Sequence, residues 1–215
     1  MRGLRRIKSV PEEDRAVYLL WAFISLMLVS GGAAIIMQFI AQSTFGWKPT
    51  VHRERFEFDS VEYITISSSD IPLDVFTYDG DKIIVEYTGE TAPHIRKDDF
   101  ELSIHKEEVF AFSFFSGDVL NYGIQVFLPD RLYRDIKLSS AAGDITVHGI
   151  RATLLNINSR TGRVDVRVPD GFELRLSYIT ETGTLTSDFT NSELENAAWY
   201  TVRTVSGDLN FNKIG

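Results

Sequence analysis

A pattern centred on a glycine recurs four times in the second half of the chain, with 19, 21 and 24 residues between successive glycines. The copies are IKLSSAAGDITV, LNINSRTGRVDV, LSYITETGTLTS and YTVRTVSGDLNF, and they cover residues 136–147, 155–166, 176–187 and 200–211. Apolar and polar residues alternate on both sides of the glycine, which predicts two half-buried β-strands joined by a turn. Because so short a unit cannot bury its own apolar face, the copies have to stack.

The turn of each copy combines the glycine with small polar residues. The predicted turn motif comprises Gly117, Gly143, Gly162, Gly183 and Gly207, together with Asp144 and Asp208. Glycine suits a turn whose backbone adopts a positive φ. A small hydroxyl residue stands three positions before the glycine in the four copies, namely Ser140, Ser159, Thr180 and Thr204. No histidine or lysine recurs beside these hydroxyls, so we expect corner hydrogen bonds rather than nucleophiles.

Stacked units of this kind predict an all-β domain with the fold of a β-helix over residues 59–215, regular from about residue 130. A β-sandwich or meander, which also has many short strands, is the alternative. Two earlier stretches are interpreted as degenerate units, 110–119 around Gly117 and 64–75 with Ser69 in place of the glycine. Residues 95–108 are expected to form a loop and a strand. As the last copy, residues 200–211 would leave an open sheet edge.

The beginning of the chain has a different composition. No charged residue occurs from Ala16 to Trp47, and the predominantly apolar stretch exceeds the roughly 20 residues that cross a bilayer as a helix. Five basic residues precede it, so the N-terminus is expected in the cytoplasm and the C-terminal domain outside a single-pass cell membrane protein. The predicted segments are a tail (1–15), a transmembrane helix (16–43) and a linker (44–58). A signal peptide cleaved near Ala41 is the alternative.

Charge narrows the expected partners. The chain carries a formal net charge of −8; residues 1–43 contain five basic and three acidic side chains, net +2, which leaves −10 on the remainder. So acidic an exterior domain argues against nucleic acid or anionic lipid as the main partner. The partners expected are the bilayer, through residues 16–43, and envelope proteins or surface polymers. There is no cysteine, hence no disulfide or thiolate chemistry.

The sequence shows no motif for catalysis, and we predict no catalytic residue, cofactor or metal. The four histidines are widely separated, without metal-site spacing. Asp144 and Asp208 are interpreted as turn residues, and Arg163, at the same position in another copy, is expected to pair with Asp144. Three aromatic residues are candidate partner contacts on the surface: Phe115, Tyr133 and Trp199.

The Ser-Gly-Asp-hydrophobic turns, the period near 20 residues and the N-terminal anchor resemble the bacterial "putative adhesin" family, over about residues 60–215. Some of its members are anchored proteins encoded with Gram-positive cell-envelope stress systems. The resemblance implies a right-handed parallel β-helix at the cell surface and supplies no catalytic residue. The function expected is therefore non-catalytic: a membrane-anchored binding surface for adhesion, or an accessory in cell-envelope stress sensing. The alternatives are a carbohydrate-active or calcium-dependent β-helix protein and a scaffold acting through its helix.

Overall fold

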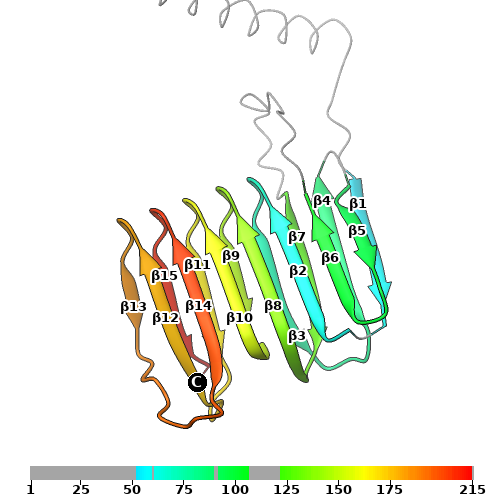
Figure 1. Ribbon diagram of the computed structural model, residues 1–215. Coiled ribbons are helices and arrows are strands. Elements are labelled where there is room, and N and C mark those ends of the chain that lie inside the picture. Colours follow the sequence, from blue (N-terminus) through cyan, green and yellow to red (C-terminus); the bar gives the residue numbers. More distant parts are fainter. Residues whose placement is uncertain (1–51, 60, 90–91, 107–121, 215) are drawn as a thin grey trace, which may run out of the picture. The chain divides into compact units, whose positions relative to one another are not determined.

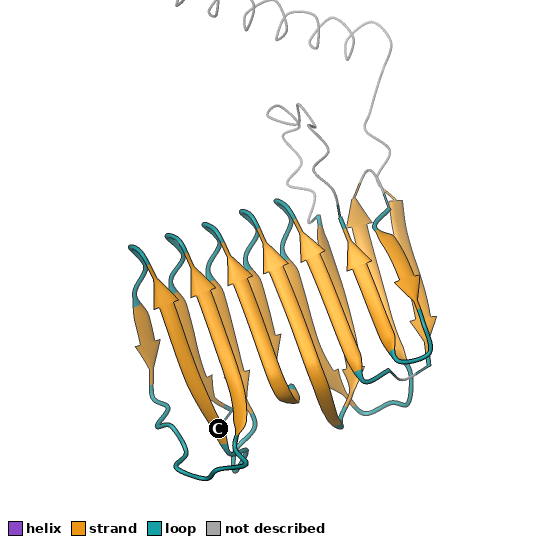
Figure 2. Ribbon diagram, viewed as in Figure 1, coloured by secondary structure: helices purple, strands orange, loops and turns teal. Residues whose placement is uncertain are grey.

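The computed structural model describes residues 52–59, 61–89, 92–106 and 122–214, all within one compact unit, Val51–Gly215. These residues form strands, turns and loops without a helix (Figures 1 and 2), so the all-β class is confirmed for them. No helix in this part of the chain could cross a membrane. The predicted tail (1–15) and transmembrane helix (16–43) lie outside the described residues.

The strands belong to two sheets. The eight-stranded sheet contains β1 (His52–Phe58), β3 (Leu73–Tyr78), β4 (Ile83–Gly89), β7 (Gly123–Pro129), β9 (Ile145–His148), β11 (Val164–Val168), β13 (Leu185–Ser187) and β15 (Leu209–Lys213). The seven-stranded sheet contains β2 (Tyr63–Ser68), β5 (His94–Lys97), β6 (Glu101–His105), β8 (Leu132–Ser140), β10 (Arg151–Ser159), β12 (Leu174–Thr180) and β14 (Ala198–Thr204).

Each copy of the sequence pattern contributes one strand to each sheet. The copies are β8 with β9, β10 with β11, β12 with β13 and β14 with β15, and all pairings between neighbouring copies are parallel. Matching positions lie side by side, as Leu155 does between Ile136 and Tyr200. Alternate residues point between the sheets, where Ile136 is 0% and Leu138 1% exposed. The alternation seen in the sequence therefore marks one continuous core.

The strands β2 and β3 form a fifth unit, in a register that differs from the one expected. Ile64 lies beside Ile136 and Leu73 beside Ile145. Ile71 therefore occupies the glycine position, and the assignment of Ser69 to that position was wrong by two residues. A shift of two residues leaves every side chain on the same face of a strand, so the apolar alternation could not distinguish the two registers.

The order of stacking departs from the order of the chain at the C-terminal end (Figure 1). The strand β14 pairs with both β10 and β12, and β15 pairs with both β11 and β13. The last copy of the pattern thus lies inside the stack, and residues 176–187 form its edge. The expectation of an open edge at residues 200–211 was wrong, because residues 188–197 let the chain return and fill the position that β12 and β13 leave open.

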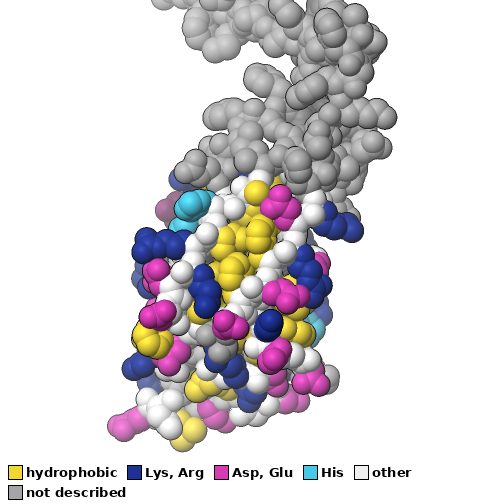
Figure 3. Space-filling model, turned by 90° about the vertical axis from the view of Figure 1, so that its right-hand side faces the viewer, with side chains coloured by type: hydrophobic (Ala, Val, Ile, Leu, Met, Phe, Trp, Pro, Cys, Tyr) yellow, Lys and Arg dark blue, Asp and Glu magenta, His cyan; other side chains and the backbone are white. Residues whose placement is uncertain are grey.

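The N-terminal end of the stack contains antiparallel strands. The strand β4 is antiparallel to both β1 and β7, and β5 is antiparallel to β6. Residues 52–58, expected within a linker, form β1, and the loop and strand expected at 95–108 include two paired strands, β5 and β6. Viewed end on, hydrophobic side chains are visible at this end (Figure 3), where Phe56, Phe58 and Ile95 are partly buried.

The stretch 110–119, interpreted from the sequence as a degenerate unit, lies outside the described residues. Gly117 of the predicted turn motif and the predicted contact Phe115 belong to this stretch. The strands on either side of it, β6 and β7, occupy the next position in the stack. They pair in parallel with β2 and β3, respectively. The unit adjoining β2 and β3 is therefore built from the residues that flank this stretch.

Candidate functional site

In each unit a turn joins the strand of one sheet to the strand of the other, and these turns lie in a row along one side of the stack (Figure 2). Their glycines are required because neighbouring turns are in close backbone contact. A Cβ added to Gly162 would lie 2.1 Å from the carbonyl oxygen of Gly143. One added to Gly207 would lie 2.1 Å from the oxygen of Gly162, and one added to Gly183 equally close to that of Gly207. The positive φ expected here was wrong, because among the described residues only Gly149 and Gly171 adopt it.

The small hydroxyl residues of the repeat close these turns from within. Ser159 Oγ donates to the carbonyl of Gly162 at 2.9 Å, and Thr204 Oγ1 donates to that of Gly207 at 2.8 Å. Ser140 is an exception: it is 6% exposed, and its Oγ has no hydrogen-bond partner among the described residues. Ser159 and Thr204 therefore have the structural role that the sequence predicted, whereas Ser140 makes no such bond to a described residue.

The aspartates that follow the glycines bind the next unit along the stack. Asp144 accepts a hydrogen bond from the backbone N–H of Arg163 at 2.7 Å. The ion pair expected between the two side chains is not among those of the described residues, so the contact is made by the backbone of Arg163 instead. Asp208 accepts from both the N–H and the hydroxyl of Thr184, at 2.9 and 2.7 Å. These hydrogen bonds, aided by the charge of Arg163, lower the pKa of Asp208.

An open groove of about 810 Å³ crosses the seven-stranded sheet beside these turns. Five neighbouring strands each place one outward residue in a single row along it, in the order His105, Ser67, Ser139, Asn158 and Arg203. We call this the turn-end groove. Lys106 and Arg160 also line it, and none of the 14 described residues that line it is an aspartate or glutamate.

The sequence reasoning missed this groove, although its row occupies a fixed position of the repeat. Ser139, Asn158 and Arg203 each stand four residues before a turn glycine. That column is polar in these copies, and Ile179 occupies it in the edge copy. The signal was available in the aligned copies, but only the stack shows that the side chains form one continuous surface.

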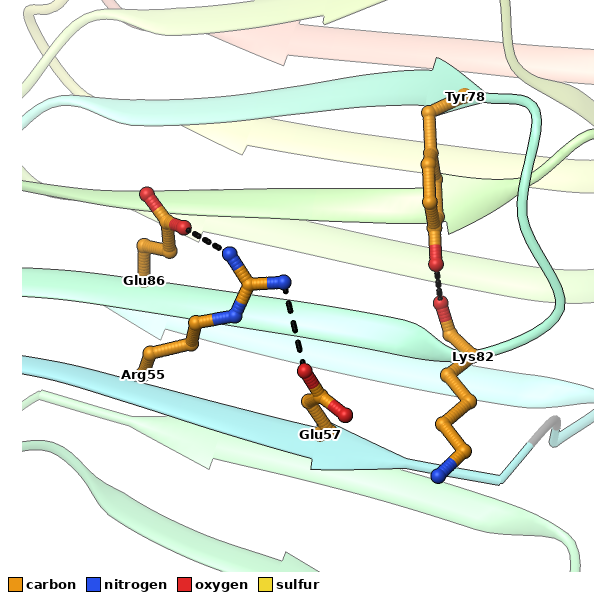
Figure 4. A network of polar contacts seen from close by, with 5 residues as sticks. All are labelled: Arg55, Glu57, Tyr78, Lys82 and Glu86. Carbon is orange, nitrogen blue, oxygen red and sulfur yellow. Dashed lines mark hydrogen bonds and ion pairs between the residues drawn. The ribbon is translucent and has the colours of Figure 1, made fainter.

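The outer face of the eight-stranded sheet differs in charge. A smaller groove of about 460 Å³ there is lined by both signs of charge, including Arg53, Asp74 and Glu86. Nearby, Arg55 binds Glu86 at 2.9 Å and Glu57 at 3.3 Å (Figure 4). The Tyr78 hydroxyl donates to the carbonyl of Lys82 in the same view. On this face, Arg55 is thus already paired with two carboxylates.

Of the aromatic residues predicted to contact a partner, Tyr133 is buried and Trp199 is exposed. Tyr133 is 1% exposed, and its hydroxyl donates to the carbonyl of Pro129 at 3.1 Å; burial raises its pKa. The prediction that Tyr133 is a surface contact was therefore wrong: its ring fills the core while its hydroxyl is satisfied internally. Trp199 is 47% exposed, with the Arg175 guanidinium 6.0 Å from its ring centre. A second buried tyrosine, Tyr200, also has its pKa raised by burial.

The C-terminal edge of the seven-stranded sheet is partly covered by residues 188–197. The side-chain amide of Asn191 accepts from the N–H of Leu176 at 2.6 Å and donates to its carbonyl at 3.3 Å. The N–H of Ser192 donates to the carbonyl of Leu174 at 2.9 Å. A side chain and a loop thus replace the missing neighbour of β12 over this part of the edge.

The geometry defines a two-sheet domain of stacked strand–turn–strand units with a groove along its turns. In the described ranges, no three histidine, aspartate or glutamate side chains are grouped so that they could hold a metal ion. No family model and no curated protein matches the chain.

The solved structures that resemble the chain include the following two. A putative cell adhesion protein from Clostridium sporogenes has 12% identity and a TM-score of 0.55, over 78% of this chain and 100% of that one. A putative adhesin from Bacteroides fragilis has 10% identity and a TM-score of 0.30, over 78% and 98% of the two chains. The first comparison shows a similar fold; the TM-score of the second is too low to support an argument.

Proposed function

We propose that the chain is a non-catalytic cell-surface protein that is anchored by residues 16–43 and binds a surface polymer in adhesion. In this proposal the exterior domain is a right-handed parallel β-helix. The parallel pairing of β2, β8, β10, β14 and β12, matched by that of their partners in the other sheet, supports it. The antiparallel strands β1, β4 and β5 are then an addition to one end of the helix.

The observation that best supports a role in adhesion is the turn-end groove. It is an open surface along which five stacked strands each place one residue in a row, which suits an extended ligand better than a small enclosed one. The Clostridium sporogenes protein is described as a "putative cell adhesion protein", which agrees with this role. An accessory role in envelope stress sensing would use the same exposed surface to contact a membrane protein.

The proposal is tested in cells that make the full chain. A photo-crosslinking amino acid is placed at Ser139 in the groove or, as the matched control, at Thr146 on the other sheet of the same unit. Mass spectrometry of the membrane fraction should find surface polymer attached at position 139 and not at 146. Neighbouring membrane proteins alone at position 139 would favour stress sensing instead, and no product at that position would refute a binding role for the groove.

The anchor has its own test. Protease added to intact cells should cut the chain after residue 48 and leave residues 1–15 protected. The reverse pattern would overturn the proposed orientation, in which basic residues hold the N-terminus in the cytoplasm.

A further inference from the structure

The turn-end groove is a basic surface on an acidic domain. The chain beyond residue 43 carries a net charge of −10, yet the described residues that line the groove include His105, Lys106, Arg160 and Arg203 and no carboxylate. We propose that it binds a linear glycan or polyol polymer that carries carboxylate or phosphate groups. This inference rests on the proposed function and specifies the ligand class of the same site.

The two arginines of the groove are free to meet an anionic ligand. Arg160 and Arg203 are both exposed, and no ion pair within 4.0 Å joins either one to a carboxylate of the described residues. On the same face of β8, Asp135 is already paired with Lys137 at 3.3 Å. A guanidinium binds a carboxylate or a phosphate through two parallel hydrogen bonds, which makes arginine well suited to either group.

The shape of the groove fits a chain that lies across the strands. Its row runs over five neighbouring strands, a span of roughly 19 Å at the usual strand spacing. Between the basic groups, Ser67, Ser139 and Asn158 offer hydroxyl and amide groups that match those of a sugar or a polyol.

The acidity of the rest of the domain does not prevent such binding. At physiological ionic strength the Debye length is about 8 Å, so exposed carboxylates elsewhere on the surface are largely screened. Contacts within the groove are much shorter than this distance. The groove on the eight-stranded sheet is lined by both signs of charge, including Asp74 and Glu86, and offers an anionic polymer no comparable surface.

The test measures binding of the full chain, held in detergent micelles, to three polymers. Poly(glycerol phosphate) supplies phosphate, polygalacturonate supplies carboxylate, and dextran is the neutral control. At least one polyanion should bind, more weakly as salt is added, and dextran should not. The double variant Arg160→Gln/Arg203→Gln should weaken binding about tenfold or more, since each lost charged hydrogen-bonding group removes a substantial part of the affinity.

Two further variants separate charge from folding. Arg55→Gln/Arg167→Gln removes the same charge from the eight-stranded sheet, away from the groove, and should change affinity by less than about twofold, because those arginines are exposed and paired with Glu86 and Asp165. Arg160→Lys/Arg203→Lys keeps the charge and should retain more binding than the glutamine variant. Equal losses in the groove and control variants would overturn the inference.

The two anionic polymers distinguish the sources of the ligand, because preference for one identifies phosphate or carboxylate as the group recognised. If neither polymer binds but Ser139 still crosslinks to surface material in cells, the anionic ligand is wrong and the adhesion role survives. If crosslinking also fails, the proposed function fails with it.

Discussion

The two ends of the stack differ in how their outermost strands are arranged. A row of parallel strands ends in unpaired N–H and C=O groups, which invite association with another chain. At the N-terminal end the protein adds antiparallel strands, β1 and β4 in one sheet and β5 in the other. At the C-terminal end it uses residues 188–197, where the Asn191 side chain pairs with the backbone of Leu176. At the N-terminal end β1 and β5 thus become the outermost strands, whereas at the C-terminal end a loop partly covers the outermost strand β12.

The interior of the stack is more constrained than the C-terminal edge. The turn of Gly162 lies between those of Gly143 and Gly207, so backbone contacts hold it from both sides. Gly183, in the edge unit, has a neighbouring turn on one side only, that of Gly207. The same substitution should therefore cost more stability inside the stack than at its edge.

Replacing a turn glycine tests this difference most severely. Gly162→Ala should lower the free energy of unfolding by about 3 kcal/mol, because its Cβ would clash with a backbone oxygen that cannot move away. Gly183→Ala should cost about 1 kcal/mol, since the edge unit can shift outward. Urea unfolding of the full chain, followed by far-ultraviolet circular dichroism, measures both.

Gly171→Ala is the control for these two substitutions. Gly171 has a positive φ of 71° and no atom within 4 Å of an added Cβ, so its cost, about 1 kcal/mol, comes from backbone strain alone. Equal losses for the Gly162 and Gly183 variants would show that the edge is as rigid as the interior.

The loop that covers the edge should have a smaller effect. Asn191→Ala removes both hydrogen bonds to Leu176 and should cost about 1 kcal/mol, because the freed backbone groups can still bind water. Hydrogen exchange at the Leu176 amide should become faster, and sedimentation should show more self-association. Asn196→Ala, in the same loop, is the matched control. Unchanged exchange in the Asn191 variant would show that other residues protect this edge.

The smallest effect is expected at Asp208, through pH. Its pKa is lower in the folded chain than in the unfolded one, so its stabilising contribution is complete above the ordinary aspartate pKa and is lost as the pH falls through the folded value. The stability difference between wild type and Asp208→Ala should therefore shrink below about pH 4. Chemical unfolding between pH 7 and pH 2 measures this difference.

Asp208→Asn separates the hydrogen bonds from the charge at this position. Its amide oxygen can still accept from Thr184 but does not titrate, so its advantage over the alanine variant should persist at every pH. A difference between wild type and alanine that stays constant down to pH 2 would contradict the assigned role of the carboxylate.

The alternation of apolar and polar residues explains which parts of the fold could be predicted from the sequence. It correctly identified the paired strands and the glycine turns of the four copies, because a half-buried strand imposes a period of two. It placed residues 64–75 two positions out of register, since a shift of two keeps the same face buried. It also placed Tyr133 on the surface, although the structure buries its ring.

By itself, the sequence determined the all-β class, the repeating unit and the residues that face the core, because these depend on local alternation and turn chemistry. Only the tertiary structure decided the order of the units, since copies with the same apolar face can stack in more than one sequence. The tertiary structure also shows why the turns require glycine: neighbouring turns are in contact, and the backbone does not adopt a positive φ there. The turn-end groove belongs with these, because residues from five strands meet there only after the units have stacked.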